Sequence, residues 1–222
     1  MAKEEDLSVS TLFKEIDEEL RQDKVTNLWK QYGTVFIAAI ICVVLGVAAY
    51  EGWKSYDLSS RAELSNKYAQ ALDLARKGDL DGASKSFQTL ADEADNGYDT
   101  LARMQQAGLL ARQNKMNEAS NAYFQIAKDS NIDPVFKEMA LVLGALNGLD
   151  VLDPKDIIAQ LQPLVGSASA WRHSATEITA YAQAKSGNKA KATELMSSLA
   201  DDASAPPGVR QRAREFAQAY TG

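Results

Sequence analysis

Three stretches of this chain align with one another, and their repetition restricts the possible folds more than any other feature. They cover residues 68–91, 104–127 and 177–200, so the copies are shifted by 36 and then by 73 residues. The second shift is about two periods, and a degenerate copy is therefore expected between the second and third. Self-similarity at a fixed period of roughly 20 to 50 residues is typical of stacked supersecondary units.

Each copy has the pattern of a helical hairpin. Small residues recur four positions apart in its first half, where they allow a second helix to pack closely: Ala71 and Ala75, Ala107 and Ala111, Ala180 and Ala184. The first helix is then expected to end at residues that tolerate a left-handed backbone: Gly78, Asn114 and Gly187. The second half repeats a small, a large and an aliphatic residue at spacings of four and three, which lie on one helix face: Ala83, Phe87 and Leu90; Ala119, Tyr123 and Ile126; Ala192, Met196 and Leu199.

The degenerate copy is expected at about residues 136–165. We expect its first helix to end at Gly148. Asp153 followed by Pro154 predicts the start of a short second helix. Pro206 and Pro207 then break the chain before a final helix that would cover the end of the stack. No alternating strand pattern occurs, so the predicted fold class is all-α, a solenoid of about four hairpins with a C-terminal capping helix.

Twenty residues without a charge separate Lys30 from Glu51, enough for a helix about 30 Å long that crosses the hydrocarbon core of a bilayer. Aromatic residues flank this segment as they do at membrane interfaces: Trp29 and Tyr32 on one side, Tyr50 and Trp53 on the other. The sequence predicts a cytoplasmic tail at residues 1–30, a transmembrane helix at 31–53 and a repeat domain at 54–222. From Ser10 onward the tail is expected to form an amphipathic helix.

Two alternatives to an uncleaved membrane anchor are a buried core helix and a cleaved signal peptide. A run this long is unusual in soluble cores. Gly46-Val47-Ala48 resembles a cleavage site, but residues 1–30 hold eight acidic and five basic residues, whereas signal peptides begin with a basic segment. Residues 11–30 hold four basic residues and residues 51–70 hold three, a weak preference for a cytoplasmic N-terminus.

Small residues at every fourth position would form a ridge along the membrane helix: Thr34, Ala38, Cys42 and Gly46. Such a ridge allows another membrane helix to approach closely. The alternative is that small residues are simply common in membrane helices.

Charge and composition exclude several classes of function. The net charge is −6 and no basic cluster occurs, which argues against nucleic-acid binding. With one cysteine and one histidine, neither a metal site nor a cofactor is expected. His173 stands one turn before Glu177, a pair capable of proton transfer in principle, but a contact on the helix surface is the favoured interpretation. We therefore expect no enzyme.

With small residues paired across each hairpin and an aromatic residue four positions after the second-helix alanine, the copies resemble tetratricopeptide repeats. They depart from that motif in their period of 36 residues, in Lys67, Leu74 and Leu110 at positions of its first-helix aromatics, and in prolines displaced to Pro134 and Pro206. A membrane-tethered helical stack suits protein binding. Six residues are candidates for a partner-binding groove: Tyr68, Leu72, Arg76, Met104, Arg112 and Tyr181. Their alternative roles are core packing and solvated helix ends.

The whole chain, and the segment Phe13 to Gly33 most specifically, is similar to the bacterial family of ancillary Sec-translocon subunits. The resemblance implies an inner-membrane protein whose helical domain lies in the periplasm. Its implied partners are the Sec translocon, a membrane-anchored periplasmic chaperone and exported proteins. An adaptor for cell-envelope assembly or division is the alternative function.

Overall fold

The computed structural model describes the backbone of residues 2–94 and 97–221, and the side chains of residues 26, 29–94 and 97–219. All regular structure within these residues is helical, which confirms the predicted fold class. The helices are α1 (Ala2–Arg76), α2 (Leu80–Glu93), α3 (Tyr98–Arg112), α4 (Met116–Lys128), α5 (Pro134–Gly148), α6 (Pro154–Leu161), α7 (Arg172–Lys185), α8 (Lys189–Asp201) and α9 (Pro207–Thr221). The chain divides into two compact units, Met1–Arg61 and Ala62–Gly222, which are described separately below.

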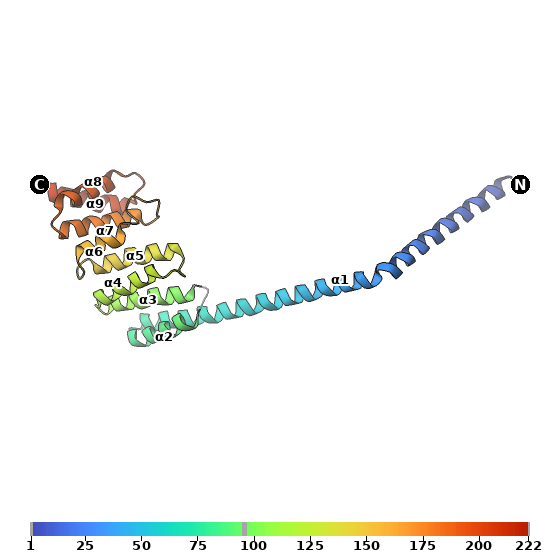
Figure 1. The fold of residues 1–222 in the computed structure, drawn as a ribbon, viewed down its shortest axis with the longest axis horizontal. Helices are drawn as coiled ribbons and strands as arrows, with labels where there is room; N and C mark the ends of the chain where they lie inside the picture. The colour runs from blue at the N-terminus through green and yellow to red at the C-terminus, as the bar shows by residue number, and fades with distance from the viewer. Residues whose placement is uncertain (1, 95–96, 222) are drawn as a thin grey trace. The chain divides into compact units, whose positions relative to one another are not determined.

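The second unit is a stack of helical hairpins. The end of α1 pairs with α2, and the hairpins α3–α4, α5–α6 and α7–α8 follow in chain order (Figure 1). The helix α9 packs on α8 and also contacts α7. The predicted degenerate copy is therefore the third hairpin, and the predicted final helix covers the end of the stack.

The turns inside the three similar hairpins have the predicted backbone. Gly78 has φ 89°, Asn114 has φ 63° and Gly187 has φ 88°. This left-handed conformation costs glycine little, and asparagine tolerates it better than most residues. The three turns are alike because each copy places one of these two residues directly after its first helix.

Small residues bring the two helices of each hairpin together, as the repeats predict. The alanine that begins each predicted pattern is completely buried: Ala71, Ala83, Ala107, Ala119, Ala180 and Ala192. Of the alanines four residues later in the first helices, Ala75 is buried, whereas Ala111 and Ala184 are only partly buried. The large residues that follow fill the core, with Phe87 and Met196 fully buried and Tyr123 almost so. Burial of these side chains stabilises each hairpin against its neighbours.

The third hairpin begins its second helix as predicted but ends its first helix for a different reason. Asp153 Oδ1 accepts a hydrogen bond from the Lys155 backbone N–H at 2.8 Å, and Pro154 occupies the first turn of α6. Gly148 ends α5 without a left-handed conformation. A Cβ atom there would lie 2.8 Å from Ser120 Oγ and from Leu152 Cδ1, so this glycine is required for close packing.

In the first unit, α1 is helical through the predicted tail and the apolar segment. The side chains that would make the tail amphipathic lie outside the described residues. Gly33 is buried beneath Trp29, whose ring would lie 3.3 Å from a Cβ at this position. Trp29 also makes an edge-to-face contact with Phe36, with ring centroids 6.4 Å apart.

Candidate partner-binding surfaces

Ion pairs at equivalent positions connect the two helices of the first hairpin and the two helices of the second. Lys67 Nζ lies 3.1 Å from Glu93 Oε2, and one period later Arg103 Nη1 lies 2.7 Å from Asp129 Oδ2. Each pair joins the first helix of a hairpin to the end of its second helix. The hydrogen bonds that Lys67 donates to the carboxylates of Glu63 and Glu93 raise the pKa of Lys67.

Asp129 gains a second hydrogen bond from the loop that follows α4. The Asn131 backbone N–H donates to Asp129 Oδ1 at 3.0 Å. Together with the hydrogen bond from Arg103, which is the larger effect, this contact lowers the pKa of Asp129.

In the fourth hairpin the equivalent acidic residue has a different partner. Asp202 stands 73 residues after Asp129, and its Oδ2 lies 3.0 Å from His173 Nε2. Ser204 contributes its hydroxyl and its backbone N–H to the other carboxylate oxygen. These two hydrogen bonds, with a smaller contribution from His173, lower the pKa of Asp202 from 3.8 to about 2.

His173 is buried, so the expected surface contact with Glu177 is wrong. The carboxylate of Glu177 instead binds Arg212 of α9. The partner of His173 comes from 29 residues further along the chain, a distance that the local sequence pattern does not cover. A long-range contact has therefore replaced the expected local one.

The cluster around His173 does not have the geometry of a catalytic triad. In such a triad one ring nitrogen faces the nucleophile and the other faces the carboxylate. Here Ser204 Oγ, at 3.4 Å, and Asp202 Oδ2 both approach Nε2. Arg172 Nη2 also donates to Ser204 Oγ at 2.9 Å. These hydrogen bonds connect the turn between α8 and α9 to the start of α7.

The apolar members of the predicted groove lie in the packed core. Tyr68 contacts the rings of Phe87 and Tyr98, with centroids 5.5 and 6.0 Å away, and its hydroxyl accepts a hydrogen bond from Gln105 Nε2 at 2.9 Å. Leu72 is half-buried in the same cluster.

Met104 and Tyr181 lie in two further clusters. Met104 is buried in the core between the second and third hairpins. Tyr181 packs edge-to-face on Phe216 at 5.5 Å, and burial raises the pKa of its hydroxyl. The apolar candidates are thus distributed over three neighbourhoods along the stack.

The two arginines of the predicted groove are exposed, yet they differ in their contacts. Arg112 Nη2 donates a hydrogen bond to the Ala75 carbonyl at 2.9 Å, across the junction between the first two hairpins. Arg76 lies in the last turn of α1, and no acceptor contacts its side chain among the described residues. Two surface hollows of the stack are lined by other residues. One lies on α1, and the other surrounds His173.

In the part of the chain that the structure describes, one helix is long and apolar enough to cross a membrane. It is the segment of α1 near the N-terminus, and a signal sequence would meet the same criterion. Its large apolar side chains are exposed, unlike those of a soluble core helix.

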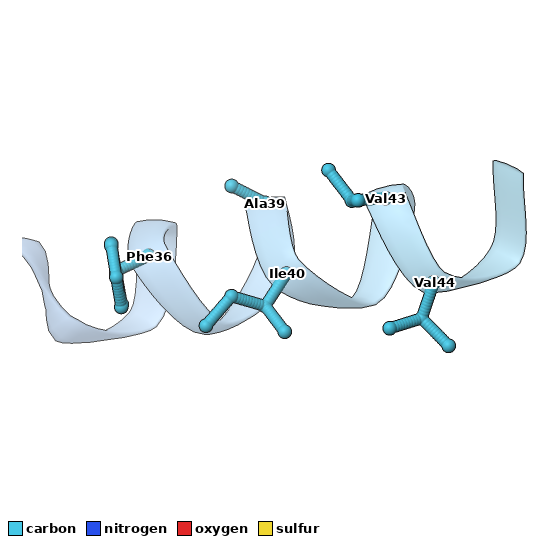
Figure 2. A pocket seen from close by; sticks show the side chains of 5 residues that line it. All are labelled: Phe36, Ala39, Ile40, Val43 and Val44. Atoms are coloured by element: carbon cyan, nitrogen blue, oxygen red, sulfur yellow. The ribbon is translucent and has the colours of Figure 1, made fainter. Parts of the chain in front are cut away.

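The apolar segment has two different sides. Figure 2 shows five side chains that line a shallow apolar hollow on the helix surface: Phe36, Ala39, Ile40, Val43 and Val44. At about 100° per residue, the centre of this hollow lies roughly 150° around the helix from the centre of the ridge Thr34, Ala38, Cys42 and Gly46. The hollow and the ridge therefore lie on nearly opposite sides of the helix.

A model of the tetratricopeptide repeat-like domain family matches residues 26–147, more than half of the chain. The chain belongs to this family. The match covers the apolar segment, the first two hairpins and most of α5, and the hairpin α7–α8 beyond it has the same turn geometry. No curated protein and no solved structure matches the chain. Domains of this family mediate protein–protein interactions, and such repeats bind through surfaces that several units share.

Proposed function

We propose that this protein is a membrane-anchored scaffold that binds other proteins. The main support is that one helix, α1, contains both the candidate span and the first helix of the repeat stack. A binding domain continuous with such a segment is suited to work at a membrane surface. The proposed organisation is a tail at residues 1–30, a span at 31–53 and a binding domain at 54–222.

The proposed orientation places the N-terminus in the cytoplasm and the stack in the periplasm of a bacterium. The basic residues before the span favour this orientation weakly. The more specific proposal is an ancillary translocon subunit that links the Sec machinery to a membrane-anchored periplasmic chaperone and to exported proteins. Its support is the resemblance carried by Phe13 to Gly33.

Within this proposal, two surfaces take different partners. The ridge Thr34, Ala38, Cys42 and Gly46 contacts another membrane helix, while the bulky side around Ile40 faces lipid. On the stack, the binding surface lies over four residues that pack in or against the core and determine its form: Tyr68, Leu72, Met104 and Tyr181. Arg76 and Arg112 provide its exposed positive charge.

Affinity purification of the full chain from gently solubilised membranes tests the partner assignment. Translocon subunits recovered together with a chaperone would support it. Reproducible recovery of envelope-assembly or division proteins without the translocon would favour the alternative adaptor. Replacing Ala38 with Leu should weaken recovery of a membrane partner, whereas Ile40→Leu, on the opposite side, serves as the matched control.

Cysteine labelling tests the orientation. In a Cys42→Ser background, a cysteine replacing exposed Ser130 should react with a membrane-impermeant maleimide once the outer membrane is opened, whereas one replacing Ser8 should not. The reverse pattern would overturn the proposed orientation. A mature product that begins after residue 48 would show that the apolar segment is a cleaved signal peptide.

A further inference from the structure

One contact between the first helices of neighbouring hairpins occurs at two of the three junctions of the stack. At the remaining junction, between α3 and α5, the equivalent position is Gly148, which has no side chain. Arg112 at the end of α3 donates to the Ala75 carbonyl at the end of α1, at 2.9 Å. Lys185 at the end of α7 donates to the Leu149 carbonyl after α5, also at 2.9 Å. The partners are separated by 37 and 36 residues, about one hairpin. In both junctions a cation neutralises the negative end of the preceding helix.

Arg76 occupies the same position in the first hairpin. It stands 36 residues before Arg112, in the last turn of α1, and its side chain is exposed. Ala75 and Leu149 each belong to the hairpin that precedes the cation, and each provides the acceptor carbonyl. No hairpin precedes α1 in the stack, so Arg76 has no such acceptor among the described residues. By equivalence with Arg112, its guanidinium is suited to bind a helix end, and the described residues provide none at this position.

The outer side of α1 differs from the surface that α3 presents to it. In α3, Ala102 and Leu109 are buried in the cluster shared with α1. One period earlier these positions are Asn66 and Asp73, which line an open hollow together with Ala69, Gln70 and Leu74.

Asp73 determines which kind of occupant this hollow accepts. Its Oδ2 forms an ion pair with Lys77 Nζ at 2.6 Å, and both side chains are exposed. Permanent burial of the carboxylate under an apolar helix would be costly. A polar helix that leaves Asp73 hydrated or pairs with it avoids this cost.

We propose that a polar helix of a partner protein packs along this hollow of α1, and that Arg76 binds the backbone carbonyls of its last turn. The proposal rests on the scaffold function proposed above and specifies the chemistry of the partner. The exposed carbonyls of a helix end carry partial negative charge, which complements a guanidinium with several donors. The partner thus continues the contact that joins successive hairpins.

Site-specific photocrosslinking in native membranes tests the proposal with the full-length chain. The photoreactive residue p-benzoylphenylalanine replaces Ala69, which is exposed in the hollow, and in a second strain replaces Leu146, which is exposed on α5. These positions are probed with Arg76 intact, with Arg76→Gln and with Lys85→Gln, at an exposed position of α2, as the matched control. Equal thermal midpoints of the variants confirm that all are folded.

We expect an adduct from position 69 that maps to the last turn of a partner helix. Because a hydrogen bond to a charged group is lost, Arg76→Gln should reduce its yield about tenfold or more. Lys85→Gln should leave the yield unchanged. An adduct that is insensitive to Arg76→Gln, or that joins two copies of this chain, would overturn the proposal.

The second position separates this inference from the proposed function. Crosslinking from position 146 without any adduct from position 69 would overturn the role of Arg76 and leave the scaffold function standing. Absence of adducts from both positions would count against the scaffold function and the inference together.

Discussion

Arg212 binds Glu177 through two hydrogen bonds, from Nε to Oε1 at 2.6 Å and from Nη2 to Oε2 at 2.8 Å. The side chain of Glu177 is 8% exposed, whereas that of Arg212 is 53% exposed. The pair joins α7 to α9, and the hydrogen bonds raise the pKa of Arg212. A carboxylate inside the stack thus depends on a residue of the final helix.

Replacing Arg212 with Met should destabilise the protein, because the Glu177 carboxylate would stay buried without its partner. The expected decrease in the free energy of unfolding is about 1–3 kcal/mol, measured by thermal denaturation followed by circular dichroism. Arg214→Met is the matched control, since its contact with the Ala200 carbonyl is long, at 3.5 Å. Equal midpoints for the two variants would contradict this role of the ion pair.

Gly144 and Gly108 stand one period apart, yet their replacement by alanine should have different effects. A Cβ at Gly144 would lie 2.8 Å from two ring carbons of Phe124 and 3.2 Å from the Ser120 carbonyl. Gly144→Ala should lower the free energy of unfolding by about 1–3 kcal/mol through overpacking. At Gly108 the nearest atom is Tyr123 Oη at 3.3 Å, which can move. Gly108→Ala should therefore be neutral or stabilising, and similar losses in both variants would refute the packing argument.

Ala83→Leu and Ala119→Leu should each destabilise a hairpin. Both alanines are completely buried where two helices approach closely. The larger side chain should cost about 1–3 kcal/mol, measured by chemical denaturation. Unchanged stability would count against the helix contacts assigned from the repeats.

Arg112→Met should weaken the junction between the first two hairpins. Loss of the hydrogen bond to the Ala75 carbonyl should lower the free energy of unfolding by about 0.5–1.5 kcal/mol. Arg76→Met, at the equivalent position without an acceptor, should leave the stability of the isolated protein unchanged. The comparison requires purified protein in detergent, and equal destabilisation by both substitutions would argue against a specific junction contact.

The low pKa of Asp202 predicts one component of the response to acid. Because the folded state holds this pKa at about 2, below the ordinary value of 3.8, the carboxylate stabilises the fold above about pH 4. This contribution is lost as the pH falls toward 2. Ser204→Ala should raise the pKa of Asp202, observed by carbon-13 NMR of the carboxyl groups, and should reduce the change in stability between pH 4 and pH 2. An unaltered titration of Asp202 in this variant would show that Ser204 is not its main stabilising partner.

The repeat pattern was sufficient to predict the hairpins because its determinants are local. Residues such as Ala83, Phe87 and Asn114 act within one hairpin, at spacings that a helix fixes. The contact of Arg112 with the Ala75 carbonyl, which joins two hairpins, was not predicted from the repeats.

Other features depend on residues that are distant in sequence and differ between copies. Gly148 is a glycine because Ser120 lies against it, and His173 is buried because Asp202 and Ser204 close over it. Nothing in the neighbouring sequence specifies these partners. For Tyr68 and Met104 the sequence left core packing open beside a role in a groove, and the structure packs Tyr68 against one core cluster and buries Met104 in another.

The shortness of α6 limits how far the stack can be divided. With eight residues, this helix leaves Phe124 of α4 and Ile178 of α7 in one apolar cluster, together with its own Ile157 and Leu161. Three consecutive hairpins consequently share a core, and removing either outer one would expose the apolar side chains of the others. Although the sequence consists of repeats, we expect its second, third and fourth hairpins to unfold together, because they share one apolar core.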